Sequence, residues 1–394
     1  MGGGLMQLVA YGAQDIYLTG NPQITFFKVV YRRHTNFSME LIEQTINGTL
    51  AASSRVTSTV SRNGDLVCGS YIKLAAGTAL DSTNGNNLGH NMLDSVEVEI
   101  GGQLIDRHYG HWMETHAELT EENPGTVAAT AAGATPAAGA TKFQGMALAG
   151  GVTDPGDGDA LLDAHYVPLR FWFNRNPGLA LPLIALQYHE VKIILNFSAA
   201  FGASGSDLTS NTSLWCDYIY LDTDERRRFA QVSHEYLIEQ VQKQDGAALS
   251  GAGTYTLNFN HPVKELVWSG VGSQTWGAVH DDAGLLIDIA GVTWQLKLNG
   301  HDRFTAQDTN YFTKLQVWKH HSGCGGVTSN SIAVYSFALK PEEHQPSGTC
   351  NFSRIDNAEL KTSASTGAQG VYIYAVNYNV LRIMSGMGGL AYSN

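Results

Sequence analysis

The chain has 394 residues and a mass of 42.5 kDa, enough for two domains or one large all-β body. Its 43% hydrophobic content, 15% charged content and 43 glycines are typical of many short strands joined by turns. Acidic residues outnumber basic ones by 36 to 24, and the longest basic run is Arg226–Arg228. Because binding to phosphate needs a basic stripe, we expect no direct contact with nucleic acid.

The four cysteines are far apart and form no CxxC motif; they are Cys68, Cys216, Cys324 and Cys350. This spacing is poor for zinc and sparse for a disulfide scaffold, so we expect free thiols in a reducing compartment. No apolar run reaches membrane-spanning length. The glycine-rich start lacks the features of a signal peptide, and Met6 stands where myristoylation needs Ser or Thr.

Residues 1–24 contain few alternating apolar positions, and we expect an extended N-terminal arm there, with a disordered tail as the alternative for the first ten. Strand-like segments follow at Thr25–Tyr31, Phe37–Asn47, Val56–Val60, Leu66–Leu74 and Ser95–Ile100. In the last segment, Val96, Val98 and Ile100 alternate with polar residues, which predicts one buried face. The pair Gly101-Gly102 predicts a hairpin that returns along Gln103–Arg107.

A short helix is expected at His108–Leu119. The next stretch, Gly125–Gly151, is mostly Ala, Gly and Thr, so we expect a surface excursion that contributes nothing to a core. The acidic loop Asp154–Asp163 continues it. Strands are expected to resume at Tyr166–Phe173 and Val191–Phe197.

The stretch Leu214–Gln242 predicts a strand, a short helix and a second strand. Its first part, Leu214–Leu221, is rich in aromatic and β-branched residues. Asp222 then stands at an N-cap position, and Glu225 three residues later comes close to a capping box. A new strand is expected at Tyr236–Gln242. The alternative to a domain junction is a charged surface turn inside one domain.

Three patterns of the first half recur in the same order in the second half. The corresponding pairs are Leu66–Leu74 with Leu257–Trp268, Val96–Tyr109 with Trp294–Phe304, and Val167–Pro182 with Ala333–Gly348. Similarity that preserves order indicates a duplicated fold, and each half has room for about eight short strands, the size of a jelly roll.

The sequence therefore predicts an all-β protein of two consecutive eight-stranded antiparallel jelly-roll barrels, with short helices in the loops. The expected parts are an N-terminal arm at residues 1–24, a first jelly roll at 25–221, a helical linker at 222–235 and a second jelly roll at 236–394.

The histidines His108, His111 and His116 lie close together in the sequence, with Glu114 nearby. A zinc site would need a further ligand or an HExxH motif, and neither is present, so we expect a plain polar helix. The adjacent pair His320-His321 is expected to be solvated.

The acidic loop is calcium-like in composition, with carboxylates at Asp154, Asp157 and Asp159. Their spacing does not fit an EF-hand, and no Glu closes the loop. An acidic solvated loop is therefore favoured over an ion site, and we expect no bound metal.

No phosphate-binding or GxSxG motif is present, so we expect no catalytic residues and no cofactor. Four tryptophans could stack on sugars, although buried or interface positions are more common for them; these are Trp172, Trp268, Trp276 and Trp294. Glycosylation motifs begin at Asn36, Asn47, Asn196, Asn211 and Asn351. Most of these lie in or beside expected strands, which leaves Asn211, in a polar loop, as the candidate glycosylation site.

Seven stretches that run in order along the chain carry a family resemblance: Gly3–Phe37, Ser61–Leu66, Pro177–Ile193, Tyr218–Gln240, Leu257–Pro262, Phe337–Ala358 and Asn377–Asn394. They resemble the major capsid protein of nucleocytoplasmic large DNA viruses, closest to the phycodnavirus or chlorovirus branch. The sequence departs from this family mainly in two loops, Gly125–Gly151 and Gly272–Gly284.

The resemblance implies two jelly rolls per chain, a homotrimer that forms a pseudo-hexagonal capsomer, and an icosahedral shell of a large double-stranded DNA virus. It implies neighbouring capsomers and minor capsid proteins beneath the shell as partners, and an internal membrane that the chain does not span. The expected place is the virion, after assembly in the host cytoplasm. The arm and the loop Pro346–Asp356 are candidates for contacts under the shell or between subunits. The rival class is a jelly-roll carbohydrate-binding protein or glycosidase.

Overall fold

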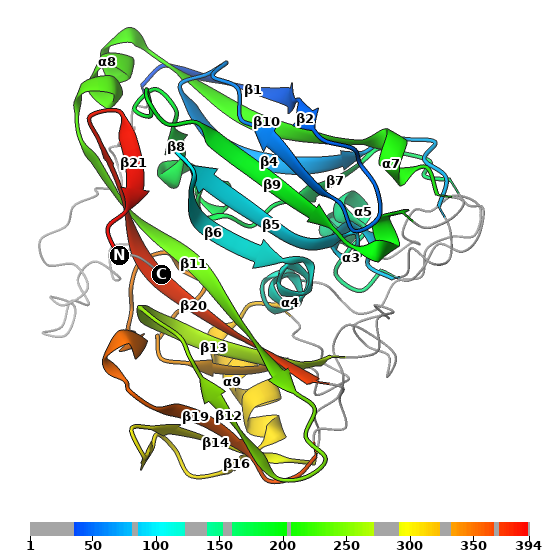
Figure 1. Ribbon diagram of the computed structural model, residues 1–394, viewed down its shortest axis with the longest axis vertical. Helices are drawn as coiled ribbons and strands as arrows, with labels where there is room; N and C mark the ends of the chain where they lie inside the picture. The colour runs from blue at the N-terminus through cyan, green and yellow to red at the C-terminus, as the bar shows by residue number, and fades with distance from the viewer. Residues whose placement is uncertain are drawn as a thin grey trace, which may run out of the picture. The chain divides into compact units, whose positions relative to one another are not determined.

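The computed structural model describes residues 35–80, 86–122, 140–152, 160–202, 206–271, 291–323, 332–365 and 370–392 (Figure 1). Residues 38–394 belong to one compact unit, which contains two jelly rolls. Several sequence predictions lie outside the described residues: the whole arm at residues 1–24, the strand Thr25–Tyr31, the acidic loop as far as residue 159, the loop Gly272–Gly284, Trp276 and Cys324.

The first jelly roll consists of two antiparallel sheets. The β4 sheet has the order β1 (Phe37–Gln44), β10 (Thr212–Leu221), β4 (Leu66–Leu74) and β7 (His165–Pro168), with β8 (Leu181–Pro182) beside β4. The β9 sheet has the order β2 (Ile46–Asn47), β3 (Arg55–Thr59), β9 (Val191–Phe197), β5 (Leu93–Ile100) and β6 (Gln103–Tyr109).

The second jelly roll repeats this arrangement. The β13 sheet has the order β11 (His234–Ala247), β20 (Gly370–Met384), β13 (Pro262–Val271) and β17 (Ile332–Ser336), with β18 (Cys350–Asn351) and β21 (Met387–Leu390) added. The β14 sheet has the order β12 (Gly253–Leu257), β19 (Ala358–Thr362), β14 (Thr293–Leu298) and β15 (His301–Asp302), with β16 (Gln307–Asp308) beside β14.

The two rolls have the same topology. When the principal strands of each are counted in chain order, one sheet holds the first, eighth, third and sixth strands, and the other the second, seventh, fourth and fifth. The three recurring sequence patterns fall on equivalent strands, since β4 corresponds to β13, the hairpin β5–β6 to β14–β15, and β7 to β17. The predicted duplication and fold class are therefore confirmed. One boundary was wrong: Leu257 ends β12, and β13 begins only at Pro262.

Short helices and helical turns occupy the connections. In the described residues they are α3 (Leu88–Asn91), α4 (Gly110–Thr120), α5 (Lys142–Ala147), α6 (Trp172–Arg175), η2 (Pro177–Leu179), η3 (Ala199–Gly202), α7 (Leu208–Asn211), α8 (Thr223–Gln231), η4 (Tyr311–Leu315), α9 (Gln316–His320) and η5 (Phe352–Arg354). The strand expected at Tyr166–Phe173 ends early, at Pro168. Proline has no N–H to continue the ladder, and Trp172 and Phe173 then enter α6 and the core.

Helix α8 connects the last strand of the first roll to the first strand of the second, as expected for the stretch Leu214–Gln242. Asp222 caps it by accepting the backbone N–H of Thr223 at 2.8 Å, instead of that of Glu225 as the capping box required. Arg226 on the helix pairs with Asp65 of the first roll at 2.9 Å. The helix is thus tied to the first roll at its N-terminal half.

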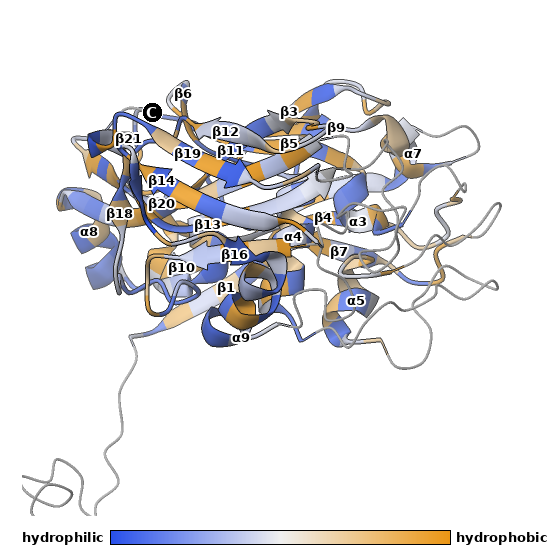
Figure 2. Ribbon diagram, turned by 90° about the horizontal axis from the view of Figure 1, so that it is seen from below, coloured by the Kyte–Doolittle hydropathy of each residue, from blue (hydrophilic) through white to orange (hydrophobic). Residues whose placement is uncertain are grey.

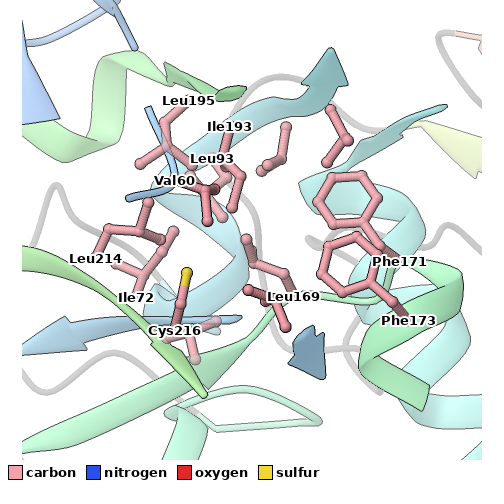
Figure 3. Close-up of a cluster of buried hydrophobic side chains, with 14 of the residues drawn as sticks. Val60, Ile72, Leu93, Leu169, Phe171, Phe173, Ile193, Leu195, Leu214 and Cys216 are labelled. Carbon is pink, nitrogen blue, oxygen red and sulfur yellow. The ribbon is translucent and has the colours of Figure 1, made fainter. Parts of the chain in front are cut away.

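The core of the first roll lies between its two sheets (Figure 3). Ile72 and Leu214 point inward from the β4 sheet, and Ile193 and Leu195 from the β9 sheet. The second core contains Trp268 and Trp294, whose ring centroids are 5.5 Å apart. Trp172, Trp268 and Trp294 are all buried, so none of the three presents a face to a sugar. Cys68, Cys216 and Cys350 are free thiols, as expected.

Part of the low-complexity stretch belongs to the first core, which contradicts the prediction of a surface excursion. Thr141 and Gln144 form a capping box at the start of α5, and Leu148 is buried in the main cluster of the first roll. Small residues allow the backbone to approach closely here: a Cβ on Gly89 would lie 1.9 Å from the carbonyl oxygen of Ala147. Composition alone therefore misjudged residues 140–151; residues 123–139 lie outside the described part.

Candidate functional site

The two jelly rolls meet through an apolar contact that resembles a protein core. Along β13 and β20, Trp268 and Ile373 point into the second core, whereas their neighbours Val267 and Tyr374 point to the opposite, outer face of the sheet. Helix α4 of the first roll covers this outer face with Trp112 and Leu119. The Trp112 and Tyr374 rings lie 5.0 Å apart.

A second contact comes from β11 and β20, which are 14 and 15 residues long. Both strands extend beyond the second roll and run alongside the first (Figure 1). Ile238, Leu381 and Ile383 on these extensions are part of the first core. The Gln240 side chain donates a hydrogen bond to the carbonyl of Ile105 on β6. The first roll is therefore completed by strands of the second, and both belong to one compact unit.

Buried charges cross the same junction. Glu239 on β11 pairs with Arg175 on α6 at 2.9 Å, with Lys264 on β13 at 2.9 Å and with His344 at 3.5 Å. Burial alone would raise the pKa of Glu239, but the neighbouring cations outweigh it and lower the pKa to about 2. The Lys264 side chain is only 2% exposed, so this carboxylate is its counter-charge inside the protein.

His321 forms a further buried ion pair, contrary to the expectation that His320-His321 is solvated. Its ring lies 3.1 Å from Glu265 and 3.2 Å from Glu342, and its side chain is 2% exposed. Burial favours the neutral ring, but the two carboxylates outweigh burial and raise the pKa to about 9. His320 is half-buried, with Nδ1 3.1 Å from the carbonyl oxygen of Leu339.

The three neighbouring histidines, His108 on β6 and His111 and His116 on α4, point to different partners. His111 lies 2.8 Å from the Tyr374 hydroxyl across the junction, and His116 lies 3.2 Å from Thr120. His108 packs on Phe171 at 4.2 Å, and burial lowers its pKa to about 3. Within the described residues, no group of three or more His, Cys, Asp or Glu side chains is placed to hold a metal ion.

The expectation of a plain polar helix for α4 was wrong. Every residue of α4 except His116 and Thr120 is buried, because the helix is enclosed by both rolls. The Glu114 carboxylate accepts the backbone N–H of Gly150 at 2.9 Å and lies 2.6 Å from Nδ1 of His90. The polar residues of α4 thus serve packing inside the protein.

A cavity of about 330 Å³ lies between α4 and the second roll. Its charged lining comes from both rolls: Glu121, Arg170 and Arg175 from the first, and Lys264, Glu265, His321 and Glu342 from the second. Arg170 pairs with Glu121 at 2.8 Å, and the other cations pair with carboxylates as described above. Arg175 therefore pairs across the junction with Glu239, whereas the other cations of the lining pair with carboxylates of their own roll.

Nine of the large apolar side chains that are exposed in the described residues fall into three groups. The α9 patch consists of Leu315, Trp318 and Leu339, of which Trp318 is 79% exposed. On β1, Met39 and Leu41 are exposed. The β21 patch consists of Tyr188, Val232, Met384 and Met387, and it adjoins a groove between the end of α8 and the β20–β21 turn. Exposed apolar groups of this size commonly mark surfaces that contact another protein.

Asn211 ends helix α7 and is half-buried, so it does not lie in an open loop as expected. Its carbonyl accepts the N–H of Ala75 at 3.0 Å. Asn36, Asn47 and Asn351 are exposed, whereas the Asn196 side chain donates to Ser95 at 2.9 Å. Glycosylation at Asn211 stays a prediction.

The charged residues of the junction were not predicted from the sequence. Arg175 and Glu239 are far apart in the chain and meet only when the two rolls dock. One signal was available, because Lys264 and Glu265 interrupt an otherwise apolar central strand. Charges in such a position need partners from elsewhere in the fold.

The chain matches two protein families over nearly its whole length. Residues 25–222 match "Major capsid protein N-terminus", and residues 225–282 and 289–389 match "Large eukaryotic DNA virus major capsid protein". The two matches meet at α8.

Similar proteins and structures agree with this. The major capsid protein of Pyramimonas orientalis virus is 51% identical, and that of Paramecium bursaria Chlorella virus 1 is 40% identical, each over 100% of both chains. A chain of the quasi-atomic structure of the PBCV-1 virus capsid superposes with a TM-score of 0.75 at 36% identity, over 94% of this chain and 100% of that one. The chain therefore belongs to the major capsid proteins of large eukaryotic DNA viruses.

Proposed function

We propose that three copies of this chain form a pseudo-hexagonal capsomer, and that many such capsomers tile the icosahedral shell of a large double-stranded DNA virus. The observation that carries the proposal is the direction in which the two rolls dock. Helix α4 of the first roll packs on the outer face of the β13 sheet of the second. The contact is head-to-tail, so it can be repeated between chains, and three chains with two rolls each can close a ring of six similar bodies.

The proposed parts are the arm at 1–24, the first jelly roll at 25–221, the linker at 222–235 and the second jelly roll at 236–394. The position of α8 between β10 and β11 supports the linker. The long β11 and β20 extensions make it unnecessary for the linker to hold the rolls together. We expect deletion of residues 1–20 to leave soluble trimers and to impair shell assembly; normal shells from the shortened chain would contradict a role for the arm in contacts under the shell.

The two ends of the rolls are proposed to face different surroundings in the shell. Helices α5 and α7 lie at one end of the rolls, and α8 and β21 at the other (Figure 1). We assign the α5 end, which includes the described residues of the low-complexity stretch, to the outside of the shell, and the β21 patch to minor capsid proteins beneath it. The internal membrane lies nearby without being spanned. No helix of the described residues is long and apolar enough to cross a membrane.

The proposed role is structural, without catalysis, cofactor or direct contact with nucleic acid, and its place is the virion after assembly in the host cytoplasm. Free thiols in the described residues fit a reducing compartment. The rival function as a carbohydrate-binding protein or glycosidase relied on tryptophans as stacking surfaces, and three of the four are buried. The candidate glycosylation site remains Asn211.

Size-exclusion chromatography with light scattering tests the trimer. The expected particle has three times the chain mass of 42.5 kDa and persists on dilution, because an obligate interface buries more than about 2,000 Å². A stable monomer at micromolar concentration would overturn the proposal.

A further inference from the structure

We propose that the α9 patch of one copy packs against the outer face of the β4 sheet in the first jelly roll of the next copy. The contact would repeat between chains the one that α4 makes within the chain. The inference rests on the proposed trimer and names the surfaces that form it.

Helices α4 and η4–α9 occupy equivalent places. Each is the first helical segment after the β5–β6 hairpin or its counterpart in the second roll. Met113 of α4 is buried in the first core, and Phe312 of η4 is buried in the second. Six residues after Met113, Leu119 packs on the neighbouring roll; six residues after Phe312, Trp318 is 79% exposed. Trp318 is therefore placed as Leu119 is, but nothing in the described residues covers most of its surface.

The outer face of the β4 sheet is equivalent to the face that α4 covers on the β13 sheet. It carries Tyr71, Lys73, Tyr166 and Trp215, all half-buried, because these residues alternate with the inward-pointing Ile72 and Leu214 and pair across the strands. The Lys73 ammonium lies 4.9 Å from the Trp215 ring and 5.7 Å from the Tyr166 ring. The face carries three aromatic rings with the Lys73 ammonium held beside two of them, and a second charge at Asp217 of β10, which is hydrogen-bonded to Tyr71.

Strand β1 extends this face at its edge. Ile42 and Gln44 point toward the first core, so Met39 and Leu41 point to the outer side, together with Trp215 on the adjacent β10. Met39 is 52% exposed and Leu41 is 38% exposed. The edge of the face therefore carries the apolar Met39 and Leu41, with the exposed Glu43 on the same side.

Each chain thus has two equivalent helical segments, α4 and η4–α9, and two equivalent outer sheet faces, those of the β4 and β13 sheets. The junction inside the chain uses α4 and the face of the β13 sheet. It leaves the α9 patch and the face of the β4 sheet, which belong to opposite rolls. In a head-to-tail ring, the α9 patch of each copy meets the β4 sheet face of a neighbouring copy, so that every α9 patch and every β4 sheet face is covered. The junction inside the chain therefore indicates that a second copy of this chain binds the α9 patch. Exposed tryptophan is also typical of interface positions that contribute strongly to binding.

Substitution of single residues tests the surfaces. Trp318→Ala on the helix side and Leu41→Ser on the sheet side are each expected to raise the concentration at which trimers dissociate, by about 30-fold or more for the tryptophan. Met387→Ser in the β21 patch is the control, since Met387 is 52% exposed, between Leu41 and Trp318, and it should leave dissociation unchanged. The thermal midpoint of the separated monomers should be unaffected in all three variants.

Photo-crosslinking identifies the partner directly. We place p-benzoylphenylalanine at position 318, mix labelled and unlabelled chains, and map crosslinked peptides by mass spectrometry. Crosslinks between chains to residues 37–44, 66–74, 165–168 or 212–221 are the expected result. Crosslinks within intact trimers to other segments, or a trimer insensitive to Trp318→Ala, would overturn the assignment of these two surfaces. Neither result would contradict the trimer itself. A monomeric unmodified chain would instead overturn the proposed function itself.

Discussion

Glu239 in the second jelly roll and Arg175 in the first form an ion pair of 2.9 Å that connects the two rolls. The same carboxylate neutralises Lys264, and its surroundings are otherwise buried. Together with the Trp112–Tyr374 contact, this pair fixes the angle between the rolls. A fixed angle is what a ring of six bodies needs, because an error at each junction would keep the ring from closing.

Glu239→Gln should destabilise the protein strongly. The change leaves the Lys264 ammonium buried without a counter-charge, which costs about 3–5 kcal/mol. Urea unfolding followed by tryptophan fluorescence measures the loss. The control is Glu343→Gln, which removes the exposed Lys340–Glu343 pair of 2.7 Å and should change stability little, because water screens an exposed pair. Equal effects of the two variants would contradict a buried, interdependent network.

His321 should make stability depend on pH in the alkaline range. Its folded pKa is about 9, against 6.5 for an unperturbed histidine. Below pH 6.5 the ring is protonated in both states and its ion pairs contribute fully; that contribution, roughly 3 kcal/mol, is lost as the pH rises through about 9. His321→Gln should therefore be much less stable than the parent at pH 6 and close to it at pH 10.

The matched control for this experiment is His301→Gln, since His301 on β15 is exposed. Its difference from the parent should stay small and constant across the same pH range. A constant difference for His321→Gln as well would show that Glu265 and Glu342 do not hold the charged ring.

Gly89→Ala should disrupt the packing of α5 on the first core. The added Cβ would lie 1.9 Å from the Ala147 carbonyl oxygen, and backbone cannot yield cheaply. We expect a loss of several kcal/mol or failure to fold. Gly145→Ala, inside α5 and with no atom within 4 Å of its Cβ, should instead be neutral or stabilise by about 0.5–1 kcal/mol. Thermal unfolding measures the stability of both variants. If Gly89→Ala is as stable as the parent, α5 is not packed against Gly89.

Tyr374→Phe should weaken the junction by removing its hydroxyl, which lies 2.8 Å from His111. A buried polar group that loses its partner costs about 1–3 kcal/mol. Tyr372→Phe is the control, because its ring contact with Lys243 at 3.7 Å is kept. Chemical denaturation distinguishes the two, and identical losses would contradict a specific role for the Tyr374 hydroxyl.

Sequence patterns predicted the parts of the fold that depend on local alternation. Val96, Val98 and Ile100 lie in β5 with their side chains buried, the glycine pair turns the chain into β6, and Val191–Phe197 is β9. The duplicated order was visible because equivalent strands have equivalent surroundings in both rolls. These features need only the neighbouring residues in the chain.

Contacts between distant segments were not predictable in the same way. His321 looked like a solvated residue because its partners, Glu265 and Glu342, approach only in the folded protein. Residues 140–151 looked like a surface loop because small residues carry no hydrophobic signal, yet they allow close packing against Gly89. Polar residues of α4 likewise gave no sign that a second roll covers them.

Two-dimensional class averages of the purified particle, imaged by electron microscopy, show whether three chains close into a capsomer. We expect a threefold particle with six similar densities arranged as a pseudo-hexagon. Particles with only two densities, or with an open chain of rolls, would contradict it.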